Sequence, residues 1–347
     1  GLPDSERSKA IQSISTDPSR STAFSWMESQ ALQDAQGASS VTSLLRSAAT
    51  DPEQAAGLVR IQAQAATTEQ GRQAIVDVQA GLARNVPAAT AMRSVSTAAA
   101  ATPEGRQARN DLFHQAAGDP ALAGAVYREF VPSSANGANN EALASFLRDV
   151  STDPQSAEQF TRLQTAAMDD PAGRQAVAAA MRTASVDPQV GRAALQVDTV
   201  AMQTETGREA VAQRLQSVAH DPLLSSFQVD TLAEAAHSDE GRAWLNAVKG
   251  DSRLSTGLCA IEASAVQTAS GREAEQRLLG QAASDPHLAA ALESAHAVAA
   301  QTEEGRAALT SLHETAAAHP ELATSLVQAQ AAALETEEGS RAVALLN

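Results

Sequence analysis

Histidine and cysteine are the side chains that most readily bind metals or act in catalysis, and this sequence of 347 residues contains seven histidines and one cysteine. The histidines are far apart, at His114, His220, His237, His287, His296, His313 and His319. A helical zinc face needs a second histidine four residues away, and the positions four either side of His296 hold Leu292 and Ala300. The histidines therefore predict no metal site.

Cys259 stands in an apolar stretch, between Leu258 and Ile261, and we expect it to be a buried small side chain. A single cysteine also excludes a disulfide framework. The motifs of serine hydrolases, zinc proteases and phosphate-binding loops do not occur in the sequence. We therefore predict no catalytic residue, no cofactor and no metal, and a protein that is not an enzyme.

The most regular charged feature is a Gly-Arg pair that recurs through the chain. Its arginines are Arg72, Arg106, Arg174, Arg208, Arg242, Arg272 and Arg306. In the first turn of a helix, each can donate to the free carbonyl groups that end the preceding helix. Each can also pair with a nearby acid, such as Glu69, Glu104, Glu205, Glu240 or Glu304. The functional alternative is an arginine ladder that binds an extended acidic partner or an anionic polymer.

Glutamines form a second candidate binding set. They include Gln62, Gln64, Gln164, Gln196, Gln328 and Gln330. If the helices that carry them line the concave side of a helical array, their amides can form hydrogen bonds with a peptide backbone. The alternative is a solvated polar face with no partner.

These side chains lie in a repeat of 17 residues, marked by the residue types that favour helix N-caps. Alternate slots begin an Asp-Pro pair, with proline at the preferred first helical position. These slots hold Asp17, Asp51, Asp119, Asp153, Asp187, Asp221 and Asp285, while Asn85, Asp251 and His319 continue the series. The other slots stand three residues before the recurrent glycine and hold Asp34, Thr68, Thr102, Asp170, Thr204, Ser238, Thr268, Thr302 and Thr336, with Asn136 in the repeat that lacks the glycine.

Between the caps, apolar residues have helical spacing, as at Ile75, Val78 and Leu82. The sequence therefore predicts an all-α, right-handed α-solenoid of about ten antiparallel helical hairpins, with helices of about 13 residues, in which each hairpin touches only its neighbours. Glycine costs about 1 kcal/mol in a helix. Its recurrence at one slot predicts close packing against the end of the preceding helix.

Two segments interrupt the regular period. In 131–140, Pro132 falls late in a helix and should end it early. The unit that starts at Ser238 has only 13 residues, about one helical turn fewer than the others. We expect a short N-terminal segment, 1–16, and then one array, 17–347, with kinks near 131–140 and 238–250.

The net charge is −16, which argues against a nucleic-acid partner because such proteins need a basic surface. No apolar run is long enough to span a membrane. Lys9 and Lys249 are the only lysines, a bias that suits a GC-rich bacterial genome. The sequence leaves open whether the protein acts in the bacterial cytoplasm or in a host cell, and whether it is oligomeric.

The period of 34 residues resembles that of tetratricopeptide repeats. The resemblance includes Asp-Pro at the hairpin junction and a small residue early in the second helix, as at Ala74, Ala108 and Ala176. The bulky aromatic expected in the first helix is present at Phe160, but Leu58 stands in that place elsewhere. The resemblance implies a helical solenoid, and no family binding residue carries over.

Three functions remain open. The first is a non-enzymatic scaffold that binds a protein or an extended peptide, either as a cytoplasmic adaptor or as a secreted effector. The second is a structural or self-assembling region of a larger protein. The third is a small-ligand or catalytic site at one of the two bends.

Overall fold

The computed structural model describes residues 4–130 and 137–346. In these ranges all regular structure is helical, and there are 21 helices. They are α1 (Asp4–Ile14), α2 (Pro18–Ala31), α3 (Ala35–Ala48), α4 (Pro52–Ala65), α5 (Glu69–Ala83), α6 (Val86–Ala100), α7 (Pro103–Ala116), α8 (Pro120–Arg128), α9 (Gly137–Val150), α10 (Pro154–Ala167), α11 (Pro171–Val186), α12 (Pro188–Ala201), α13 (Glu205–Ala219), α14 (Pro222–Ala235), α15 (Asp239–Val248), α16 (Ser252–Ala265), α17 (Ala269–Ala282), α18 (Pro286–Ala299), α19 (Glu303–Ala318), α20 (Pro320–Ala333) and α21 (Glu337–Leu346).

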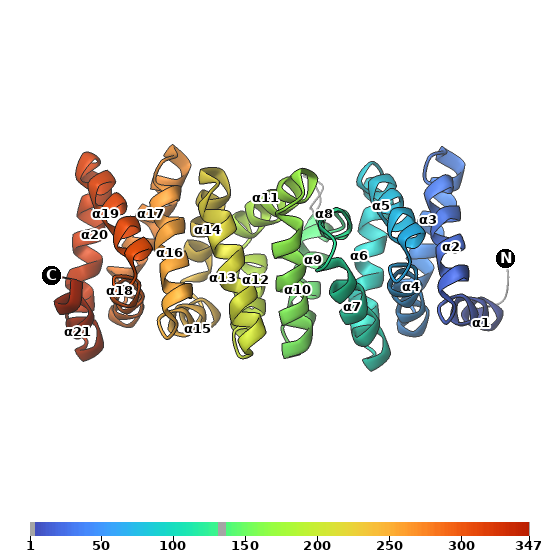
Figure 1. The fold of residues 1–347 in the computed structure, drawn as a ribbon, viewed down its shortest axis with the longest axis horizontal. Coiled ribbons are helices and arrows are strands. Elements are labelled where there is room, and N and C mark those ends of the chain that lie inside the picture. Colours follow the sequence, from blue (N-terminus) through green and yellow to red (C-terminus); the bar gives the residue numbers. More distant parts are fainter. Residues whose placement is uncertain (1–3, 131–136, 347) are drawn as a thin grey trace. The chain divides into compact units, whose positions relative to one another are not determined.

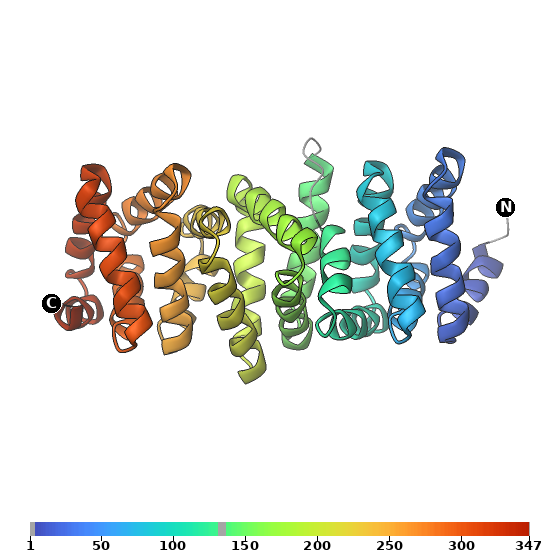
Figure 2. The same ribbon diagram turned by 45° about the horizontal axis from the view of Figure 1, so that its top comes forward.

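The chain divides into two units, residues 1–180 and 181–347. Within each unit, helices lie side by side in chain order (Figures 1 and 2). This arrangement confirms the predicted all-α solenoid of helical repeats. The expected kinks and the expected single array stay predictions.

The helix starts follow the capping residues of the sequence. Asp51 accepts hydrogen bonds from the backbone N–H groups of Glu53 and Gln54, at 3.0 and 3.3 Å, and the other Asp caps do the same with the first turns they precede. The Thr caps accept instead from the recurrent glycine three residues on, as from Gly71 to Thr68 at 2.9 Å. His319 begins α20 without a side-chain capping bond. Asn136 lies outside the described residues.

The recurrent glycine is explained by close backbone contact. A Cβ atom added at Gly71 would lie 1.9 Å from the carbonyl oxygen of Ala65, the last residue of α4. The same contact, at 1.9 to 2.4 Å, recurs between each glycine of the series and the alanine six residues before it. These alanines are Ala31, Ala65, Ala99, Ala167, Ala201, Ala235, Ala265, Ala299 and Ala333. The prediction of close packing against the preceding helix is confirmed.

Packing reaches further along the chain than the sequence suggests. From α1 to α10 and from α12 to α21, each helix packs against the helix three positions on, and most even-numbered helices also pack against the next even-numbered helix. Helices adjacent in sequence make smaller contacts. The contact of α2 with α5 joins neighbouring hairpins, as expected, but α3, of the α2–α3 hairpin, also contacts α6, which belongs to the hairpin after next.

Both irregular segments shorten a helix. The helix before Pro132, α8, has 9 residues, whereas the other helices that begin at Asp-Pro have 14. Helix α15 has 10 residues, whereas the other helices of the Gly-Arg series have 14 to 16. Beside the first of these segments, four phenylalanines and the only tyrosine form one aromatic cluster, with ring centroids 4.3 to 6.3 Å apart. Its members are Phe113, Tyr127, Phe130, Phe146 and Phe160. Residues 131–136 lie outside the described residues.

Candidate functional site

The seven arginines of the Gly-Arg series close helix junctions. The Nη1 atom of each donates to the carbonyl six residues before it, at the end of the preceding helix, over 2.6 to 3.5 Å. Arg306, for example, donates to Ala300 at 2.8 Å. This is the capping arrangement that the sequence favours, and it uses one of the five N–H donors of each guanidinium. The arginine ladder stays a prediction.

Acidic partners of this series are not the ones expected from the sequence. Arg72 pairs with Asp119 at 3.3 Å and Arg242 pairs with Asp285 at 3.5 Å. Each of these aspartates caps the helix three positions on, so the ion pairs follow the packing between those helices. Glu104 instead pairs with Arg60. The surface pairs contribute little free energy, typically below about 1 kcal/mol each.

The glutamines singled out in the sequence do not form one surface. Gln62 is buried, with its Nε2 atom 3.9 Å from the sulfur of Met92. Gln164 is half-buried and donates to the Tyr127 hydroxyl at 3.0 Å. Gln64 and Gln196 are also half-buried. The Nε2 atoms of Gln62 and Gln164 thus contact side chains inside the helix layer. The expectation that this set lines a binding face stays a prediction.

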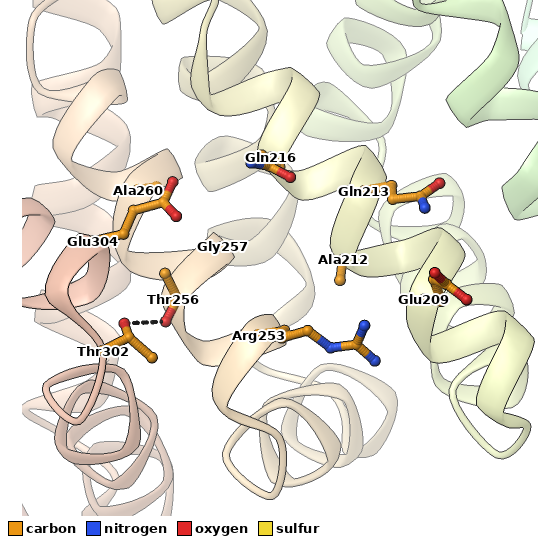
Figure 3. A pocket seen from close by; sticks show the side chains of 10 residues that line it. All are labelled: Glu209, Ala212, Gln213, Gln216, Arg253, Thr256, Gly257, Ala260, Thr302 and Glu304. Carbon is orange, nitrogen blue, oxygen red and sulfur yellow. Dashed lines mark hydrogen bonds between the residues drawn. The ribbon is translucent and has the colours of Figure 1, made fainter.

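A polar groove in the second unit offers better placed side chains. It is a cavity of about 380 Å³ that lies between α13, α16 and α19 (Figure 3). Its walls carry Glu209 and Gln213 on α13, Arg253 and Thr256 on α16, and Glu304 on α19. Gln216, Ala212, Gly257, Ala260 and Thr302 complete the lining.

Most polar side chains of this groove are exposed and unpaired. Within the described residues, Glu209, Gln213, Gln216, Arg253 and Glu304 make no side-chain hydrogen bond or ion pair. Thr256 differs, since its hydroxyl lies 2.7 Å from that of Thr302 and fixes the position of α16 against the start of α19 (Figure 3). The groove therefore presents two carboxylates, one guanidinium and two amides to a ligand.

A second cavity of about 610 Å³ lies beside the shortened helix, between α15, α18 and α21. It repeats the arrangement of the first groove, with one even-numbered helix between two odd-numbered ones. Lys249 and Glu338 form an ion pair within its lining. Arg341 and Asn246 also line it.

Buried charges form three clusters, which sequence reasoning missed. In the first unit, Glu129 accepts from Ser96 at 3.1 Å and from Gln79 at 3.3 Å. Burial raises the pKa of Glu129 to about 7, and the charge of Arg93 and the two hydrogen bonds oppose that rise. In the second unit, Asp198 pairs with Arg214, which also donates to Gln228 at 2.9 Å. The buried carboxyl groups of Glu129 and Asp198 therefore both accept hydrogen bonds from neighbouring side chains.

The third cluster lies between α16, α17 and α18 and contains Cys259, Glu262, Glu275, Glu293 and His296. His296 Nε2 is 3.0 Å from Glu262 Oε2, and His296 Nδ1 is 3.9 Å from Glu293 Oε1. The three carboxyl groups are 0% exposed. Burial opposes protonation of His296, but Glu262 and the two other acids raise its pKa to about 9.

One property of the repeat could have identified this third cluster. Cys259 and Glu293 both stand eight residues after the cap of their helix, and Glu262 and His296 both stand eleven after it. The two slots share one buried helix face, and α16 and α18 pack together. Comparison of equivalent positions in consecutive repeats would have shown four side chains of metal-binding types on the same face of two neighbouring helices.

Comparisons with known proteins add no relative: no family model, no curated protein and no solved structure matches this chain. In the part of the chain that the structure describes, no helix is both long enough and apolar enough to cross a membrane.

Proposed function

We propose that this protein is a non-enzymatic scaffold of tetratricopeptide-like repeats that binds an extended peptide segment of a partner protein in the groove between α13, α16 and α19. The observation that carries the proposal is the set of five unpaired polar side chains that surround one cavity. Because a peptide backbone exposes both N–H donors and carbonyl acceptors, the amides of Gln213 and Gln216 can serve either group.

Charge defines the peptide further. Glu209 and Glu304 lie on opposite walls of the groove, and Arg253 extends from the helix between them (Figure 3). A peptide with basic side chains toward both walls and a carboxylate toward α16 would complement this arrangement. The net charge of −16 also favours association with a basic partner.

A displayed library of random peptides tests the proposal. Peptides selected on the wild-type protein should be rich in Lys and Arg, and the variant Glu209→Gln, Glu304→Gln should bind them at least about 10-fold more weakly, because two charged contacts are lost. Glu321→Gln is the matched control, since Glu321 is an exposed acid on α20 outside the groove. Selected peptides that bind the double variant and the wild type equally would overturn the proposal.

Self-association is a second candidate, supported by exposed apolar side chains on α20 and at its C-cap, Leu334. Val327 is 62% exposed and Leu334 is 52% exposed. In the equivalent slots of α16, Cys259 and Val266 are fully buried. Sedimentation velocity over a range of concentrations separates this function from the first: Val327→Glu should abolish any dimer, and a wild-type protein that stays monomeric throughout excludes this candidate.

A further inference from the structure

The acidic cluster of the second unit differs from the other buried charges because it lacks donors. Five of its six carboxylate oxygens have no hydrogen-bond partner: both of Glu275, both of Glu293, and Oε1 of Glu262. Asp198 has Arg214 and Glu129 has two hydrogen-bond donors, whereas among the described residues of this cluster only His296 faces the carboxyl groups with a basic side chain. A buried carboxylate without a partner is costly, and a bound cation would offset that cost.

The donor atoms are close enough to share one ion. One ligand atom each from Cys259, Glu262 and His296 lies within 4.8 Å of both others. Glu275, from α17, is not part of this group of three, although both of its buried carboxylate oxygens lack a hydrogen-bond partner. Cysteine sulfur, histidine nitrogen and carboxylate oxygen are the three kinds of donor that bind Zn²⁺ in proteins.

We propose that Cys259, Glu262 and His296 bind one Zn²⁺ ion in the core of the second unit, and that Glu293 orients His296. In this assignment the Nε2 atom of His296, which faces Glu262, is the ligand. Its Nδ1 atom then lies 3.9 Å from Glu293 Oε1, on the side where a carboxylate commonly holds the outer nitrogen of a zinc-bound histidine. Glu293 is therefore a positioning residue.

The site is structural. The side chains of its ligands are buried, so a substrate has no access to the ion. The ion would join α16 and α18, and its positive charge would offset the nearby buried carboxyl groups that lack donors. Binding displaces protons from the Cys259 thiol and from His296, so zinc affinity should fall as the pH is lowered.

The test uses the full chain and ZnSO₄ as the probe. Metal is removed with chelator, and Zn²⁺ is then added both to the folded protein and during refolding from urea, because the site is buried. The expected result is one Zn²⁺ per chain, and a Co²⁺ complex with thiolate-to-cobalt charge-transfer absorption. Zinc should also raise the Tm of the wild-type protein.

Single substitutions distinguish the residues that bind zinc from nearby residues that do not. Cys259→Ala should abolish the charge-transfer absorption, and Glu262→Gln should weaken zinc binding more than Glu293→Gln, for which an orienting role predicts about a 10- to 100-fold loss. His313→Ala is the matched control, because this histidine of α19 is exposed and lies outside the ligand set. Far-ultraviolet circular dichroism shows which variants fold.

Three results would overturn the assignment: a zinc content far below one per chain after refolding with ZnSO₄, a Co²⁺ complex without thiolate absorption, or equal zinc binding by folded Glu262→Gln and wild-type protein. Because the groove residues lie outside this cluster, peptide binding can succeed or fail independently of the zinc result.

Discussion

Two glycines of α17 provide opposite predictions for the same substitution. A Cβ atom at Gly271 would lie 2.0 Å from the carbonyl oxygen of Ala265 and 2.5 Å from Ser226 Oγ. The backbone contact can be relieved only if α17 moves away from α16, which strains the hydrogen bonds from Gly271 to Thr268 and from Arg272 to Val266, each of 2.9 Å. At Gly280, by contrast, an added Cβ would meet nothing within 4 Å.

The two variants should therefore change stability in opposite directions. Overpacking costs about 1–3 kcal/mol and a damaged cap about 1 kcal/mol, while alanine gains about 1 kcal/mol of helix propensity over glycine. We expect Gly271→Ala to lose about 2 kcal/mol of stability and Gly280→Ala to gain about 0.5–1 kcal/mol. Both variants add one methyl group to the same helix, so the difference between them isolates the contact with Ala265.

Urea unfolding measures both effects, with the m-value required to stay constant. Because repeat arrays can unfold in more than one step, hydrogen exchange of the amides in α17 provides a local measurement in parallel. Equal stability changes for the two variants, or a stabilising Gly271→Ala, would refute the explanation that the glycine series exists for close backbone contact.

Three further predictions concern buried and junction charges. Burial raises the pKa of Glu28 from 4.5 to about 8. Because the unfolded state loses its proton at a lower pH than the folded state, the free energy of unfolding should fall by up to about 5 kcal/mol as the pH rises through this range. The urea midpoint of Glu28→Gln should equal that of the wild type near pH ~4 and exceed it near pH ~9. Asp198→Ala should cost about 3–5 kcal/mol because Arg214 is left buried without an acidic partner. The double variant Asp198→Leu, Arg214→Met should recover most of that loss, and additive effects in a double-mutant cycle would contradict this coupling. Arg306→Met removes the hydrogen bond to Ala300 and should cost about 1 kcal/mol, whereas no change in thermal unfolding would show that the cap contributes nothing.

The helix starts could be predicted from sequence because their determinants are local. Thr68 and Gly71 are three residues apart, and the bond between them is visible as a pattern in one repeat. The role of Arg72 follows in the same way, since its carbonyl acceptor, that of Ala66, is only six residues away. Repetition along the chain made each of these short-range signals stronger.

Packing between non-adjacent helices could not be predicted in the same way. Contacts between helices three positions apart decide which faces are covered, and these contacts depend on the angle at every junction. The groove amides consequently come from Gln213 and Gln216 on an odd-numbered helix, whereas the sequence favoured glutamines of even-numbered helices. The buried cluster was missed because Glu262 and His296 are 34 residues apart.

The binding claim for the groove is tested most directly by photo-cross-linking a selected peptide to the protein. A peptide with a photoreactive residue at its centre should form cross-links to α13, α16 and α19, and mass spectrometry should locate them near Gln213, Gln216 and Thr256. An excess of unlabelled peptide should remove these cross-links. Cross-links that are confined to other helices, with none in the groove, would contradict the account.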